Sequence, residues 1–190
     1  MPRLIVIAGP PGSGKSTLFP VSAFGVDSFN ADDRAAELNG GSYLRINTQI
    51  RQQVNREFES FISSHIETRK SFAFETTLRT EITFEQARAA REAGFEVEMR
   101  YVALNDFAMN LDRVRIRADQ GGHSAPESVL RRIHEASIRN LGRAICEIDL
   151  LRVYDNSGWG KAPNLLLESR AGKIVFRLDL LSEWLAAFMR

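Results

Sequence analysis

The chain has 190 residues, a length typical of one domain, and 44% of them are hydrophobic, which is enough for a core. Its 25 lysines and arginines nearly balance 24 aspartates and glutamates, so no overall field recruits nucleic acid or an anionic membrane, and we expect neither as a partner. The single cysteine, Cys146, excludes a disulfide within the chain, and neither a leader pattern nor a bilayer-length apolar run is present, so we expect a soluble, cytoplasmic protein.

The most informative segment lies close to the N-terminus. The apolar run from Arg3 to Ala8 predicts a buried parallel strand, and the next nine residues match the phosphate-binding pattern G-x-x-x-x-G-K-[ST]. Glycines let successive N–H groups converge on a phosphate group, Lys15 would reach the β- and γ-phosphates, and the Ser16 hydroxyl would bind Mg²⁺. We therefore expect a nucleotide-binding loop, the P-loop, made of Gly9, Pro10, Pro11, Gly12, Ser13, Gly14, Lys15, Ser16 and Thr17.

Two acidic residues follow short predicted strands. Residues 25–29 lead into Asn30-Ala31-Asp32-Asp33-Arg34, and residues 71–74 lead into Glu75-Thr76-Thr77-Leu78-Arg79. In an open α/β sheet, side chains just past the carboxyl ends of strands face the ligand crevice. Asp32 is therefore placed to be a catalytic acid, whereas Asp33 is equally suited to cap the next helix. Glu75 would contact substrate or metal-bound water, or alternatively favour a helix N-terminus as a carboxylate.

The middle of the chain predicts further helices and strands. Apolar residues recur at helical spacing from Tyr43 to about Lys70, after the good N-cap residue Ser42, and this pattern predicts one long amphipathic helix. Residues 83–93 predict another helix, and residues 95–104 predict a strand.

Arginines gather around a glycine-rich loop at residues 119–126. Arg113 and Arg117 lie one turn apart on the helix before this loop, and Arg131 opens the helix after it. Two helices that bring arginines to a glycine-hinged loop are typical of a lid that closes over polyphosphate, here about residues 113–132. For any one of these arginines, a solvated, ion-paired position is the alternative.

The C-terminal part predicts a last core strand at residues 149–154, followed by the turn Asp155-Asn156-Ser157, which would border the nucleotide base or form an ordinary Asx turn. Residues 164–168 and 173–178 flank a hairpin turn, and residues 180–190 predict a final amphipathic helix. We expect this hairpin and helix, about residues 163–190, to be a structural appendage.

The order of these elements predicts a single domain of the α/β class with the P-loop NTPase/kinase fold. We expect an open, mostly parallel five-stranded sheet with helices on both faces, a helical lid, and a C-terminal β-hairpin plus helix.

Six segments together resemble the zeta-toxin family of P-loop kinases: residues 9–17, 30–32, 74–78, 101–104, 113–123 and 154–157. The resemblance covers about residues 3–158. It implies a kinase that uses ATP or GTP with Mg²⁺ and phosphorylates a hydroxyl of a small molecule, which in the best-known relatives is UDP-N-acetylglucosamine. It also implies a small helical antitoxin as a protein partner.

The same resemblance assigns roles to residues of this chain. Asp32 corresponds to the general base, Glu75 corresponds to an acidic residue that helps to hold substrate, and Lys15 and the lid arginines would stabilise the transferring phosphoryl group. Arg117 and Arg131 are the expected catalytic arginines, and Arg113 is expected to bind nucleotide. The remaining expected substrate contacts are Arg34, Thr76, Thr77, Arg79 and His123.

Alternative functions stay open at this point. A housekeeping kinase for another sugar, nucleoside or cofactor would use the same residues. A nucleotide-dependent switch that acts on a protein partner would need the P-loop but would have no use for two acids at one crevice. A nucleic-acid end kinase is not supported by any basic segment interleaved with aromatic residues.

Overall fold

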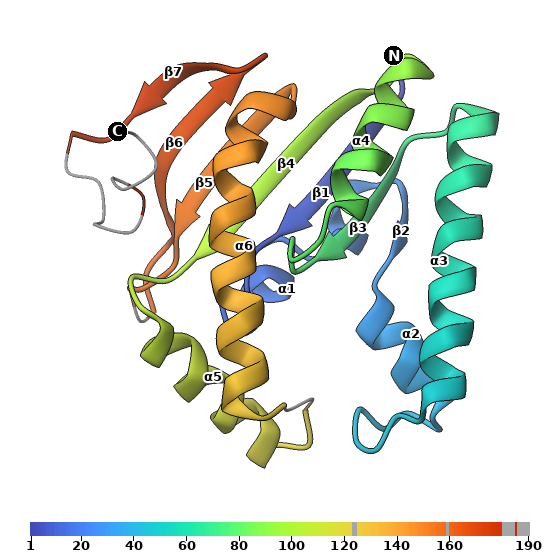
Figure 1. Cartoon of the computed structure of the whole chain (residues 1–190), viewed down its shortest axis with the longest axis vertical. Coiled ribbons are helices and arrows are strands. Elements are labelled where there is room, and N and C mark those ends of the chain that lie inside the picture. Colours follow the sequence, from blue (N-terminus) through green and yellow to red (C-terminus); the bar gives the residue numbers. More distant parts are fainter. Residues whose placement is uncertain (123–124, 159, 180–184, 186–190) are drawn as a thin grey trace.

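The structure, a computed structural model, describes residues 1–122, 125–158, 160–179 and 185. A seven-stranded sheet runs through it in the order β2-β3-β1-β4-β5-β6-β7 (Figure 1). The first five strands in this order are parallel to their neighbours, and the last two are antiparallel. The strands are β1 (Arg3–Ala8), β2 (Asp27–Phe29), β3 (Phe72–Thr76), β4 (Glu96–Ala103), β5 (Leu150–Asp155), β6 (Asn164–Arg170) and β7 (Lys173–Arg177).

The predicted fold class is confirmed, and the parallel part of the sheet has the expected five strands. The predicted total of five is wrong, because the C-terminal hairpin is no separate appendage. β6 pairs with β5 from Leu150 opposite Arg170 to Asp155 opposite Asn164, so the hairpin satisfies the backbone groups on the open side of β5. The predicted helix at residues 180–190 lies outside the described residues apart from Leu185, which is buried in the main core.

The helices are α1 (Lys15–Leu18), the 3₁₀ helix η1 (Val21–Phe24), α2 (Ala31–Leu38), α3 (Thr48–Thr68), α4 (Ile82–Glu92), α5 (Phe107–Asp119) and α6 (Glu127–Glu147). Most lie within a few residues of their predicted positions, but α3 begins later than expected. Asn47 is its N-cap, because its side chain accepts a hydrogen bond from the Ile50 N–H at 2.9 Å. Ser42 instead accepts from the Leu44 N–H within the preceding loop.

The two faces of the sheet are covered unequally. Helices α3, α4 and α6 lie over one face (Figure 1), where they enclose the larger core cluster around Phe72 and Phe74. The opposite face has a smaller cluster, in which Ile5 and Ile7 of β1 pack under Val21 and its neighbours in the segment after the P-loop. The expected helical cover on this second face is therefore reduced to two single-turn elements, α1 and η1.

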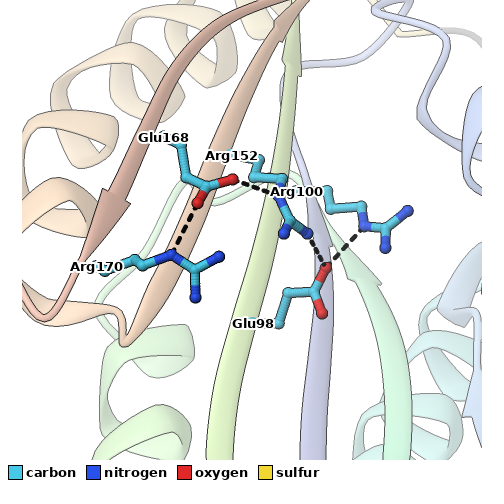
Figure 2. A network of polar contacts seen from close by, with 5 residues as sticks. All are labelled: Glu98, Arg100, Arg152, Glu168 and Arg170. Carbon is cyan, nitrogen blue, oxygen red and sulfur yellow. Dashed lines mark hydrogen bonds and ion pairs between the residues drawn. The ribbon is translucent and has the colours of Figure 1, made fainter. Parts of the chain in front are cut away.

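A charged ladder crosses the second face on β4, β5 and β6 (Figure 2). The Glu98 carboxylate accepts from Arg100 Nε at 2.9 Å and from Arg152 Nη1 at 3.0 Å, and the Glu168 carboxylate accepts from Arg152 Nε and Arg170 Nε, both at 2.8 Å. The hydrogen bond from Arg152 is the main cause that holds the pKa of Glu168 below its usual value. Because opposite charges alternate, the partly buried ions remain paired.

The ladder reaches the segment that follows the P-loop. The Arg100 guanidinium lies 5.0 Å from the ring centre of Phe19 and 4.9 Å from that of Phe24, which are cation–π distances. Phe19 also packs against Tyr154 of β5, with ring centres 4.9 Å apart. These contacts hold the short helix α1 against the sheet. No helix in the described part of the chain has the length and apolarity that crossing a bilayer requires.

Candidate nucleotide and acceptor site

The P-loop connects β1 to α1 in a conformation that requires glycine. Gly9, Gly12 and Gly14 have φ angles of 141°, 79° and 91°. A Cβ atom on Gly9 would lie 2.1 Å from the Val102 carbonyl oxygen, and one on Gly12 would lie 2.4 Å from the Asn110 carbonyl oxygen. The loop is therefore packed against neighbouring backbone so closely that no side chain fits.

We expect Gly9→Ala to lower the free energy of unfolding by about 3 kcal/mol, because the methyl group must displace the β4 backbone in addition to straining φ. Urea unfolding followed by circular dichroism would measure the loss. Gly25→Ala is the matched control, since Gly25 also has a positive φ of 67° but nothing lies within 4 Å of a Cβ there. Its cost should be about 1 kcal/mol. Equal losses in the two variants would contradict the packing argument.

Two asparagines from other elements hold the P-loop. The Asn110 amide of α5 donates to the Pro11 carbonyl at 2.8 Å, and the Asn156 amide, just after β5, donates to the Ser13 carbonyl at 2.9 Å. The backbone carbonyl of Asn156 accepts from the Arg113 guanidinium at 2.9 Å. Sequence reasoning found no role for Asn110 and named Asn156 only as part of a turn. Its position past a strand end was the one available signal.

Lys15 is buried beside the loop that it completes. Its Nζ donates to the Pro10 carbonyl at 3.3 Å and lies 3.7 Å from Glu75 Oε1. Burial lowers the pKa of Lys15, although the carboxylates of Glu75 and Asp32 oppose this shift. Phosphate oxygens placed at the ammonium group would add negative charge and raise that pKa again.

Ser16 and Glu75 place two oxygen groups side by side. The Ser16 hydroxyl donates to Glu75 Oε2 at 2.7 Å. Glu75 lies within β3, next to its last residue, on the strand that pairs with β1. A hydroxyl and a carboxylate beside a triphosphate site fit Mg²⁺, which takes oxygen ligands and fills the rest of its shell with water and phosphate.

Asp32 was expected just past the end of a strand, but the structure places it inside the helix that follows. It lies in the first turn of α2, and Asn30 is the helix cap, accepting from the N–H groups of Asp32 and Asp33 at 3.0 and 3.4 Å. The alternative of Asp33 as the cap is therefore wrong, and Asp33 instead accepts from the Tyr43 hydroxyl at 2.8 Å. Among the described residues, none hydrogen-bonds to the Asp32 carboxylate.

A cleft of about 1190 Å³ joins these groups. It brings together most of the residues predicted for the site: Pro11, Gly12, Gly14, Lys15, Ser16, Thr17, Asp32, Glu75, Thr76, Thr77, Arg79, Arg113 and Arg117. Arg113 and Arg117 come from the same face of α5, as their spacing predicts.

The remaining predicted residues lie elsewhere. Gly9, Pro10 and Ser13 do not line the cleft, and His123 lies outside the described residues. Arg34 lines a smaller neighbouring cavity of about 340 Å³ and pairs with Glu57 at 2.6 Å and Glu37 at 3.0 Å.

Arg131 is not brought to the cleft either. Its guanidinium donates to Glu127 at 3.0 Å and lies 4.3 Å from the ring centre of Phe107. The ion-paired alternative describes Arg131, because it pairs with Glu127 and does not line the cleft, although its helix neighbours Leu130 and Ile133 do.

A further part of the cleft wall was not predicted. It is formed by Tyr43, by four residues of α3 and by Gln86 of α4; the α3 residues are Arg51, Asn55, Phe58 and Glu59. Gln86 Oε1 is buried and has no hydrogen-bond partner among the described residues. On an amphipathic helix such polar residues look like ordinary surface residues, so the sequence carries no signal for them.

Comparisons with known proteins place this site in a wider context. The family model described as Zeta toxin matches residues 35–160, a range that begins after the P-loop and Asp32. An uncharacterized protein of Haemophilus influenzae (strain ATCC 51907 / DSM 11121 / KW20 / Rd) is 28% identical over 130 residues, which are 68% of this chain and 90% of that protein.

Two solved structures are similar in fold. The AvrRxo1-ORF1:-ORF2 crystal structure with ATP has a TM-score of 0.70 at 17% identity, covering 100% of this chain. This chain spans only 63% of the length of that one. The PezAT chromosomal toxin-antitoxin system of Streptococcus pneumoniae has a TM-score of 0.63 at 14% identity, covering 97% of this chain and 75% of that chain. The P-loop kinase fold is thus confirmed, and it supports nucleotide-dependent phosphotransfer.

Proposed function

Because this chain belongs to the zeta toxin family of P-loop kinases, we propose that it transfers the γ-phosphoryl group of ATP or GTP to a hydroxyl of a small molecule. One observation carries the proposal. A single cleft of about 1190 Å³, which has room for two substrates, is lined by Lys15, Ser16 and Glu75 at the P-loop and extends to Asp32 and to residues of α3. A nucleotide switch would have no use for the second half of this cleft.

Each of these residues has a separate role in phosphoryl transfer. The P-loop amides and Lys15 hold the phosphates, and Arg113 and Arg117 add positive charge where the transferring group gains negative charge. Ser16, with Glu75 acting directly or through water, would hold Mg²⁺, which neutralises charge on the β- and γ-phosphates when bound. Asp32 accepts the proton of the acceptor hydroxyl, and this proton transfer lags behind a loose transition state.

The acceptor would lie against the α3 and α4 wall. Arg51, Asn55 and Gln86 offer hydrogen-bonding groups there, beside the ring of Phe58. This mixture suits an acceptor that has both polar substituents and a flat apolar surface, and a sugar nucleotide has both. UDP-N-acetylglucosamine is the specific acceptor that the family resemblance suggests.

The test is transfer of label from [γ-³²P]ATP or [γ-³²P]GTP to a panel of sugar nucleotides, free sugars and nucleosides. We expect a phosphorylated sugar nucleotide, and we expect EDTA to abolish its formation. Ser16→Ala should lose most of the Mg²⁺-dependent rate, whereas Ser63→Ala, which removes an exposed hydroxyl that lines neither cavity, should keep it. Release of inorganic phosphate with no labelled acceptor would favour the switch, and a labelled nucleoside would favour a housekeeping kinase.

The proposed function also includes a protein partner and a location in the cell. The PezAT structure is of a toxin-antitoxin system, and this supports a small helical protein that neutralises the present chain. ATP and Mg²⁺ are abundant in the cytoplasm, where we place the reaction. Inhibition of the labelled transfer by the product of a neighbouring gene would test the partner.

A further inference from the structure

Helix α1 carries two central residues of the proposed site, yet it is only one turn long. Lys15 and Ser16 both lie in it, and its C-cap residue, Phe19, donates its backbone N–H to the Lys15 carbonyl at 2.8 Å. Pro20 comes next and has no N–H group with which to continue the helix. Because a single helical turn is not stable by itself, contacts outside α1 must hold Lys15 and Ser16 in place.

Two strand residues on the second face of the sheet contact the ring of Phe19. The Arg100 guanidinium of β4 lies 5.0 Å from its ring centre, and Tyr154 of β5 packs against it with ring centres 4.9 Å apart. The same guanidinium lies 4.9 Å from the ring centre of Phe24 in η1. Arg100 thus contacts, at cation–π distances, both the C-cap of α1 and the next short element after the P-loop.

The Arg100 side chain is itself held by the strands. Its Nε donates to the Glu98 carboxylate at 2.9 Å, and Glu98 also accepts from Arg152 Nη1 at 3.0 Å (Figure 2). Only 25% of the Arg100 side chain is exposed, so water screens its charge incompletely. The position of the guanidinium is therefore set by β4 and β5. Glu98 would keep its ion pair with Arg152 if Arg100 were replaced.

We propose that Arg100 is a positioning residue for nucleotide binding, because it keeps α1 formed before the nucleotide arrives. The inference rests on the proposed function, since it concerns the binding of the phosphates. Neither Arg100 nor Phe19 is among the described residues that line the cleft. The effect of Arg100 therefore reaches Lys15 through the ring of Phe19 and its backbone hydrogen bond.

This role predicts a particular split between binding and turnover. Without the cation, α1 would be formed in a smaller fraction of free chains, and the apparent affinity for nucleotide falls by that fraction. Once nucleotide is bound, α1 is formed in every variant. The KM for nucleotide should therefore rise, while kcat stays within about twofold of wild type.

Titration with a fluorescent ATP analogue and Mg²⁺ tests the proposal without any acceptor. Arg100→Ala should raise the dissociation constant about tenfold, and Phe19→Leu should raise it by a similar factor. The double variant should bind little more weakly than either single variant, because both substitutions remove the same contact. Arg100→Lys keeps a cation near the rings and should recover most of the affinity.

Arg170→Ala is the matched control. It removes an arginine from the other end of the ladder, where Arg170 pairs with Glu168 and has no contact with α1 or η1 in the described part of the chain. Its dissociation constant should stay within about twofold of wild type. Hydrogen exchange of the Phe19 amide, which is bonded to the Lys15 carbonyl, should become faster in Arg100→Ala and remain unchanged in Arg170→Ala.

The outcomes separate this inference from the proposed function. A wild-type chain that binds the analogue but transfers no phosphoryl group would contradict the kinase proposal alone. An Arg100→Ala chain with the wild-type dissociation constant would overturn the positioning role, even if its unfolding midpoint fell, because that result describes a merely structural contact. A loss of kcat with an unchanged KM would overturn it as well. If Arg100→Ala does not fold, Phe19→Leu and Arg100→Lys decide by the same measurement.

Discussion

Asp32→Asn should lower the rate of phosphoryl transfer by about a thousandfold while the nucleotide dissociation constant stays within about twofold of wild type. Asparagine keeps the shape of the side chain but cannot accept the acceptor's proton. Asp32 lines the cleft, and no described residue hydrogen-bonds to its carboxylate, so the substitution breaks no structural contact. Turnover under saturating acceptor and calorimetric titration with a non-hydrolysable nucleotide would separate the two effects.

The neighbouring residue supplies the matched control. Asp33 is also at the cleft, but its carboxylate accepts from the Tyr43 hydroxyl. Asp33→Asn should therefore keep near-normal turnover and lose some stability in the loop that Tyr43 joins. Full activity in Asp32→Asn would show that this aspartate is not the catalytic base. An equal loss of activity in both variants would show that the negative charge of the two aspartates together, and not Asp32 alone, causes the effect.

Lys15→Met should reduce turnover by about a thousandfold or more and weaken nucleotide binding as well. The ammonium group is buried, so water cannot replace its charge, and the methionine leaves Glu75 without its cation. Steady-state kinetics with the labelled nucleotide would measure the loss, and thermal unfolding would show whether the domain remains intact.

Lys161→Met is the comparison for this prediction. Lys161 also lines the cleft, but no ion pair or hydrogen bond of its side chain is found among the described residues. We expect that variant to keep turnover within about threefold, because an exposed charge is screened by water and salt. A Lys15→Met enzyme with wild-type turnover would be incompatible with the P-loop as the phosphate site.

Local signals in the sequence were sufficient for the parallel sheet and for several of the residues that line one cleft. The P-loop spacing predicts the contact of Lys15 and Ser16 with the cleft. Glu75 follows from the rule that residues at the carboxyl ends of parallel strands share one edge. Arg113 and Arg117 follow from helical spacing alone. Each of these inferences needs only residues that are close in sequence, within one helix or strand and the loop beside it.

The structure differs from the expectations where a choice depended on distant residues. The Arg131 side chain pairs with Glu127 and lies over the ring of Phe107. The sequence alone does not show whether Arg131 binds these two partners or a phosphate group. Both Asn30 and Asp33 are suitable caps, and Tyr43 of a later loop takes the Asp33 carboxylate. The hairpin joins the sheet because the open side of β5 needs partners, which is a property of the assembled sheet.

The way in which the P-loop is anchored bears on when nucleotide can first bind during synthesis. Pro11 is held by Asn110, 99 residues later, and Ser13 is held by Asn156, 143 residues later. An emerging chain that has not yet produced β5 therefore has the correct glycines and lysine and the Asn110 contact, but it lacks the Asn156 contact that holds Ser13. A ribosome-bound fragment that ends before β5 should fail to retain a fluorescent ATP analogue, and the grip on ATP should appear only once Asn156 has left the exit tunnel.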